Sequence, residues 1–238
     1  MTPRPCWITL AVAMTAACGS SGLTSPSPAA TACNPTASSA RSANPIFDKP
    51  FRGDFPTGNL FDHDKPVPFG DSNSYLISTC GTRAADPPET NGHDGYDWRM
   101  PEGTPLFAVA DGEVLVAGQS APLFCPPLGR TVQALVVAMR HVDANGEVFL
   151  SLYGHLSRVD VTAGQHLSNG AAIGLSGNTG CSGTPHLHFG VLRPTPRGIN
   201  VVIDPYGWHA SSIDPWEADP QGAPSVWLWR EGEAPGLR

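Results

Sequence analysis

Short runs of β-branched and aromatic residues, separated by turn residues, dominate the chain after about residue 46. No window longer than a few turns repeats its apolar positions with the 3.6-residue period of a helix. The pattern therefore predicts a mostly β, antiparallel single domain over residues 46–215, with short helices or none. The expected strands are 104–110, 113–117, 131–140, 148–153, 186–192 and 199–203.

Gly- and Asn-containing turns divide these runs. Asp111-Gly112 stands between two β-rich runs and predicts a hairpin, and the segment 143–146 (Asp-Ala-Asn-Gly) predicts another turn. The last segment, 216–238, holds three of the six Trp residues. We expect this tail to be a flap packed on the domain, with a surface for stacking glycans as the alternative.

The N-terminus has the pattern of an export signal. Arg4 precedes an eleven-residue apolar stretch, Trp7 to Ala17, that is too short to span a bilayer. Small residues before Cys18 resemble a bacterial lipoprotein box, although Thr15 stands where Leu is usual. We predict a signal peptide at 1–18 with a lipid on Cys18, or else ordinary cleavage and secretion. A flexible linker rich in Ser, Ala, Thr and Pro follows at 19–45.

Composition narrows the class of protein. Gly and Pro are abundant, with 26 and 25 residues, and only 15% of residues are charged. The formal net charge of −7 argues against a nucleic-acid partner, and no run of 18 apolar residues predicts a membrane-spanning helix. Export also makes disulfides possible. The four cysteines that remain after the signal are Cys33, Cys80, Cys125 and Cys181. Four cysteines can form two disulfides in three different pairings.

Histidine is the most informative residue for chemistry. His186 and His188 stand two apart in a strand-like run, so both face the same side of a sheet. His93 and Asp97 are four apart, and Gly95 between them would let the chain curl until the two side chains converge. Two imidazoles and a carboxylate are a ligand set that catalytic zinc uses, with a fourth position left to water.

Further motifs accompany these histidines in a fixed order along the chain. The full series is His93-x-x-x-Asp97, Gly103-Thr-Pro-Leu-Phe-Ala, Ala110-Asp-Gly-Glu-Val, Tyr153-Gly-His155-Leu, Gly164-Gln, Gly170, Ile173-Gly174, Gly177-x-Thr-Gly180 and His186-Leu-His188-Phe189, with Asp204-Pro205 as a last match. Over about Gly92 to Phe189, this series resembles the LytM/lysostaphin family of zinc metallopeptidases. The resemblance implies two antiparallel sheets with a groove over one of them. It also implies an endopeptidase acting on peptidoglycan peptides.

The resemblance assigns roles to five residues. His93, Asp97 and His188 would hold one Zn²⁺ per chain, and His155 and His186 would be the catalytic histidines. Zinc would acidify a bound water, one imidazole would accept its proton, and the other would stabilise the oxyanion. The alternative is a non-catalytic protein of the same fold that binds or activates another hydrolase. Such proteins have lost ligands, whereas all five positions are present here.

Three further expectations concern the surroundings of this site. Cys125 and Cys181, the latter just before the His pair, are predicted to form a disulfide, with Cys33–Cys80 as the second pair. A segment around Asn59 could cover the groove, because an upstream Asn occludes zinc in some family members. The other histidines are expected to be structural, and His63 is placed in a solvated loop; the rest are His141, His166 and His209.

Overall fold

The computed structural model describes residues 35–37, 42–67, 75–85 and 92–237. The predicted signal peptide, the lipidated Cys18, Cys33 and most of the predicted linker lie outside the described residues. Within the described residues, no helix is long and apolar enough to cross a membrane.

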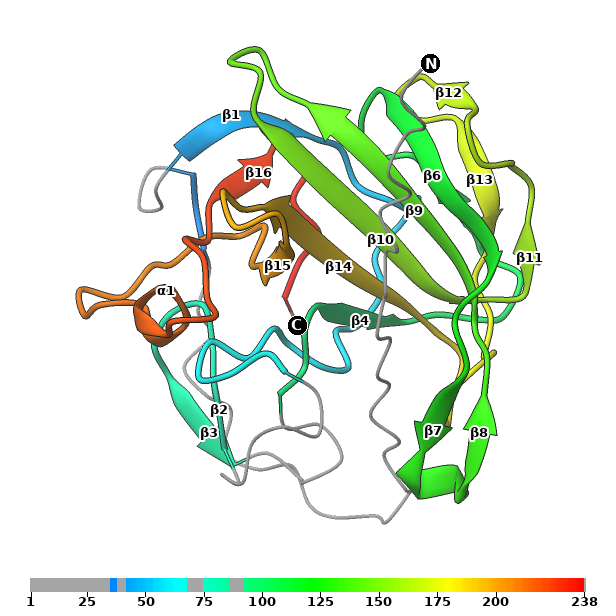
Figure 1. Cartoon of the computed structure of the whole chain (residues 1–238), viewed down its shortest axis with the longest axis horizontal. Coiled ribbons are helices and arrows are strands. Elements are labelled where there is room, and N and C mark those ends of the chain that lie inside the picture. The colour runs from blue at the N-terminus through cyan, green and yellow to red at the C-terminus, as the bar shows by residue number, and fades with distance from the viewer. Residues whose placement is uncertain (1–34, 38–41, 68–74, 86–91, 238) are drawn as a thin grey trace, which may run out of the picture.

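A seven-stranded antiparallel sheet forms the centre of the molecule (Figure 1). Six of its strands follow the order β12-β6-β9-β10-β14-β15, and β4 pairs with β14 beside β15. Its strands are β4 (Tyr96–Arg99), β6 (Gly112–Gln119), β9 (Leu135–Val142), β10 (Val148–Leu156), β12 (His166–Leu167), β14 (His186–Pro194) and β15 (Asn200–Ile203).

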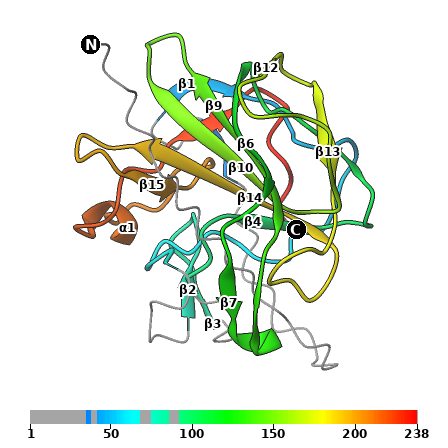
Figure 2. The ribbon, with the colours of Figure 1, turned by 45° about the vertical axis from the view of Figure 1, so that its right-hand side comes forward.

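Smaller sheets surround this centre. A three-stranded antiparallel sheet has the order β11-β13-β5, with β5 at Pro105–Phe107, β11 at Arg158–Val159 and β13 at Ala172–Leu175. Two-stranded pairs complete the fold: β2 (Tyr75–Ile77) with β3 (Arg83–Ala85), β7 (Leu123–Cys125) with β8 (Arg130–Val132), and β1 (Ser42–Phe47) with β16 (Trp227–Trp229). The β7–β8 hairpin projects at the end of the molecule opposite β12 (Figure 2).

Helices are confined to two single turns in the described residues. They are the 3₁₀ turn η1 (Pro126–Leu128) and α1 (Pro215–Ala218). The predicted mostly β fold with antiparallel sheets and short helices is therefore confirmed. The predicted turn at 143–146 is also present, since the Gly146 N–H donates to the Asp143 carbonyl between β9 and β10.

The predicted hairpin at Asp111-Gly112 is wrong. Strands β5 and β6 belong to different sheets, because β5 pairs with β13 while β6 pairs with β9 and β12. Gly112 is required for another reason. A Cβ at this position would lie 2.4 Å from the Arg140 carbonyl oxygen, so Gly112 allows β6 to approach β9 closely.

The C-terminal segment packs into the main hydrophobic core. Trp216, Trp227 and Trp229 are buried, and β16 pairs in parallel with β1. The Phe189 ring of β14 lies 5.8 Å from the Trp229 ring and 5.3 Å from that of Tyr153. These buried Trp rings hold the edges of the fold together and are not exposed for stacking on a glycan.

Candidate metal centre

Three side chains meet at the edge of the central sheet where β4 pairs with β14. The His93 Nε2 atom lies 3.2 Å from Asp97 Oδ1 and 3.1 Å from His188 Nδ1, and His188 Nδ1 lies 3.0 Å from Asp97 Oδ1. All three residues are buried. Among the described residues they are the group of His, Cys and acidic side chains able to hold one metal ion.

Strand register explains this convergence. His188 on β14 stands directly opposite Asp97 on β4, and β10 lies along the other edge of β14 with Gly154 opposite His188. Gly95 lets the segment 93–97 press against β14, because a Cβ there would lie 2.4 Å from the Phe189 carbonyl oxygen. The convergence of His93 and Asp97 across this glycine agrees with the sequence prediction.

The geometry and charge of the three groups suit a cation. Ligand atoms bound to one tetrahedral zinc ion lie about 3.3 Å apart, close to the separations found here. Burial alone would raise the Asp97 pKa, but the adjacent histidines outweigh it and hold that pKa well below its usual range. Burial alone would lower the His93 pKa, but the Asp97 carboxylate outweighs it and raises that pKa to about 9. The three groups thus stabilise positive charge between them.

His155 approaches the same point from β10. Its backbone has a φ of 62°, the one positive φ among described residues other than glycine, where β10 breaks register with β9 between Tyr153 and Leu156. Non-glycine residues in this conformation are uncommon and cluster at functional sites. The bend brings the His155 ring centroid to 4.7 Å from that of His186 and 6.0 Å from that of His188.

One loop, residues 177–184, orients both of these histidines. The Thr179 carbonyl accepts from His155 Nδ1 at 2.7 Å, and the Thr184 carbonyl accepts from His186 Nδ1 at 2.7 Å. The hydrogen of each neutral ring is therefore on Nδ1. The two Nε2 atoms are buried and make no hydrogen bond within the described part of the chain. The pKa of His155 is lowered to about 3. Burial is the largest cause of this shift, and the neighbouring His186 and His188 add to it.

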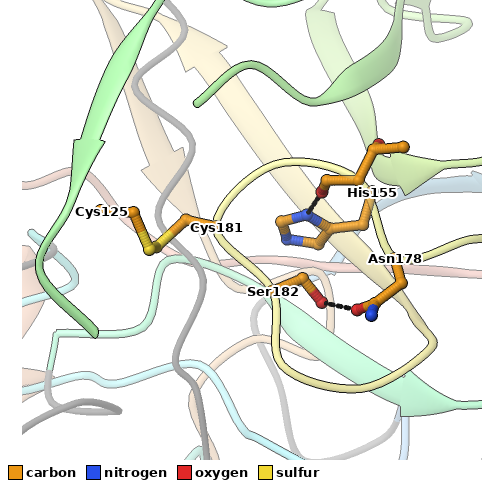
Figure 3. The surroundings of a disulfide bond; sticks show 6 residues. Cys125, His155, Asn178, Cys181 and Ser182 are labelled. Atoms are coloured by element: carbon orange, nitrogen blue, oxygen red, sulfur yellow. Dashed lines mark hydrogen bonds between the residues drawn. A yellow bond between two sulfur atoms is a disulfide. The ribbon is translucent and has the colours of Figure 1, made fainter. Parts of the chain in front are cut away.

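A disulfide holds this loop in place. Cys125 of β7 is bonded to Cys181, as predicted, with a Cα–Cα distance of 5.4 Å. The loop that carries Cys181 curves around the His155 ring, and the Ser182 hydroxyl donates to the Asn178 side chain within it (Figure 3). Cys80 is also disulfide-bonded, while its predicted partner Cys33 lies outside the described residues.

The upstream segment supplies contacts to two of the candidate ligands. The Asn59 side-chain amide donates to Asp97 Oδ2 at 2.7 Å, which leaves Oδ1 facing the two histidines. The Leu60 carbonyl accepts from His93 Nδ1 at 3.0 Å, which leaves His93 Nε2 free of hydrogen when the ring is neutral. Asn59 thus contacts a candidate ligand, and the covering of the groove by its segment stays a prediction. Backbone carbonyls such as those of Leu60 and Thr179 carry no signal in a sequence and could not be predicted.

The prediction that His63 lies in a solvated loop is wrong. Its side chain is fully buried, with Nδ1 2.9 Å from Asp214 Oδ1 and Nε2 2.9 Å from Asp204 Oδ2. The charged residues around His63 in the sequence suggested exposure to solvent. In the fold, the charge of the His63 ring is neutralised by the buried carboxylates of Asp204 and Asp214. His141 is also buried and bonded to the Asp111 carbonyl and the Ser151 hydroxyl, so it is structural as expected.

Comparison with known proteins identifies the same region. Residues 91–204 match the sequence model of the family described as Peptidase family M23. Peptidoglycan DD-endopeptidase ShyA of Vibrio cholerae is 37% identical over 100 residues, which are 42% of this chain and 20% of that protein. Lysostaphin of Staphylococcus simulans is 36% identical over 97 residues, 41% of this chain and 17% of that protein.

The chain therefore spans about a fifth of the length of these two relatives. Among solved structures, the catalytic domain of lysostaphin from Staphylococcus simulans aligns with a TM-score of 0.40 and 26% identity, covering 59% of this chain and 82% of that one. Residues 91–204, which match the family model, contain all five side chains of the candidate site. The family resemblance of the sequence motifs is confirmed.

Proposed function

Because residues 91–204 of this chain match the sequence model of peptidase family M23, we propose that the protein is a zinc-dependent endopeptidase that hydrolyses peptide bonds in bacterial peptidoglycan. The observation that carries the proposal is the meeting of five buried polar side chains at one point of the central sheet. Three of them form the cation site, and beside it the other two present Nε2 atoms that make no hydrogen bond within the described residues.

His93, Asp97 and His188 are the proposed ligands of one Zn²⁺ ion. Bound there, zinc would act as a Lewis acid and lower the pKa of a water molecule toward neutrality. Hydrogen bonds from the upstream segment orient two of these ligands by binding the atoms that point away from the proposed zinc site. Asn59 and the Leu60 carbonyl bind Asp97 Oδ2 and His93 Nδ1, so the atoms left over are the ones that face one another.

His155 and His186 are the proposed catalytic residues. Each ring is fixed by a hydrogen bond from Nδ1 to a loop carbonyl, so its Nε2 can accept a proton without rotation of the ring. One of the two accepts the proton of the attacking water and passes it to the leaving amine. The other, protonated on both nitrogens, stabilises the oxyanion of the tetrahedral intermediate.

A non-catalytic protein of this fold is the alternative function. The five intact and converging side chains favour the enzyme over that alternative. The printed names of two relatives, a peptidoglycan DD-endopeptidase and lysostaphin, support a peptidoglycan peptide as the substrate.

Export to the cell envelope belongs to this proposal. Its support is the sequence pattern of residues 1–18, which favours a lipoprotein anchored through Cys18 over a secreted form. One lipid chain gives only marginal binding, so anchoring would require two or more acyl chains on this residue. The membrane contact would then be made by lipid alone.

Digestion of purified cell-wall sacculi tests the proposed activity. The protein is incubated with sacculi, with and without a zinc chelator, and the released fragments are identified by mass spectrometry. We expect new amine and carboxyl ends at one class of peptide bond, and loss of that cleavage with the chelator. A zinc-loaded protein that releases no fragment would support the non-catalytic alternative instead.

A further inference from the structure

Each proposed zinc ligand has one atom that faces the cation site and one that points away from it. The outward atoms of His93 and Asp97 are bound by the Leu60 carbonyl and the Asn59 amide. The outward atom of His188 is Nε2, which is buried and makes no hydrogen bond within the described residues. With zinc on Nδ1, the neutral His188 ring would carry its hydrogen on Nε2, and a buried N–H without an acceptor costs about 1–3 kcal/mol.

Asp94 presents the complementary atom. Its Oδ1 is also buried without a hydrogen bond in the described residues, and it lies 3.4 Å from His188 Nε2. The hydrogen-bond range for such a pair is 2.7–3.2 Å, so a movement of a few tenths of an ångström joins them. Two unpartnered polar atoms thus face each other directly behind a candidate ligand.

The backbone holds Asp94 at this position. Asp94 lies between His93 and Gly95, in the segment that packs closely on β14 opposite the Phe189 carbonyl. The side chain of Asp94 is only 9% exposed, so it has little access to solvent. Its position therefore follows from the same bend that brings His93 and Asp97 together.

We propose that Asp94 is a positioning residue for the metal centre, whose carboxylate accepts the Nε2–H of His188 and directs the Nδ1 lone pair of that ring toward zinc. This inference rests on the proposed function. Histidine ligands of metals commonly donate their second N–H to a carboxylate, which fixes the tautomer and strengthens the ligand. Loss of such a partner typically weakens metal binding by 10- to 100-fold.

Zinc affinity of the full chain tests this role without an assay of activity. Asp94→Ala is compared with the wild type by competition against a chromophoric chelator, and we expect its zinc dissociation constant to be 10- to 100-fold higher. Asp94→Asn keeps the size and an acceptor oxygen but loses the charge, so it should lie between the two. If Asp94→Ala fails to fold, Asp94→Asn decides the question, and wild-type affinity in that variant would overturn the inference.

Asp143→Ala is the matched control. Asp143 is likewise a buried carboxylate, but it accepts from the Asn145 and Glu147 N–H groups in the β9–β10 turn. The Asp143→Ala substitution should lower the stability of the fold and leave its zinc affinity unchanged. Equal zinc binding by Asp94→Ala and wild type, or an equal loss in Asp143→Ala, would overturn the role of Asp94. A wild-type protein that binds no zinc would instead refute the proposed function.

Discussion

Replacement of His63 should produce a loss of stability that depends on pH in a defined direction. Both ring nitrogens face carboxylate oxygens at 2.9 Å, and carboxylates accept but do not donate. The ring must therefore carry a hydrogen on each nitrogen, which makes it an imidazolium between Asp204 and Asp214. Burial opposes this charge, but the two carboxylates outweigh it and raise the His63 pKa from 6.5 to about 9.

The size of the effect follows from that shift. Each pKa unit corresponds to 1.36 kcal/mol, so charging His63 stabilises the folded protein by on the order of 3 kcal/mol. Because the folded-state pKa is the higher one, this contribution is complete below pH 6.5. It is lost as the pH rises through 9, where the folded protein also gives up the proton.

Urea unfolding followed by Trp fluorescence measures the prediction. The free energy of unfolding of wild type minus that of His63→Gln should fall by roughly 3 kcal/mol between pH 6.5 and pH 10. His141→Gln is the control, because burial lowers the pKa of His141 to about 4 and that ring is neutral throughout this range. Its difference from wild type should stay constant. A His63→Gln difference that is constant, or that grows with pH, would refute the imidazolium between two carboxylates.

Three further changes test other parts of the structure. Cys125→Ser with Cys181→Ser should retain about one zinc per chain but lose most sacculus digestion and about 4 kcal/mol of stability, because the loop that orients the catalytic histidines is released; unchanged digestion would contradict this. Gly95→Ala should weaken zinc binding at least tenfold in a chelator competition, since its Cβ would lie 2.4 Å from the Phe189 carbonyl oxygen; wild-type affinity would show that the bend is not needed. Cys18→Ser should move the protein from the membrane fraction to the soluble fraction, and an unchanged distribution would remove the lipid anchor.

The sequence was sufficient to predict β10 and β14, two of the three strands that carry the site, but no strand was expected where β4 carries Asp97. Runs of β-branched and aromatic residues bounded by turn residues located β10 and β14, and both strands are buried on both faces over most of their length. The two-residue period of a strand placed His186 and His188 on one side of β14. Gly95 explained how the side chains of His93 and Asp97 could meet, and in the structure His93 Nε2 lies 3.2 Å from Asp97 Oδ1.

Contacts between distant segments could not be predicted in this way. The close approach of β6 to β9 requires Gly112, yet in the sequence Asp111-Gly112 has the pattern of a hairpin turn. His63 stands among charged residues, and only the fold shows that Asp204 and Asp214 come from far along the chain to neutralise it. Partners set by tertiary structure leave no local pattern.

Zinc content measured beside sacculus digestion in three variants tests the central claim most directly. His188→Ala should lose both zinc and activity, because it removes one of three protein ligands. His155→Ala and His186→Ala should keep about one zinc per chain and lose on the order of a hundredfold or more in rate, because a proton acceptor or oxyanion donor is gone. Full activity in His186→Ala, or zinc retained by His188→Ala and lost from His186→Ala, would contradict the account.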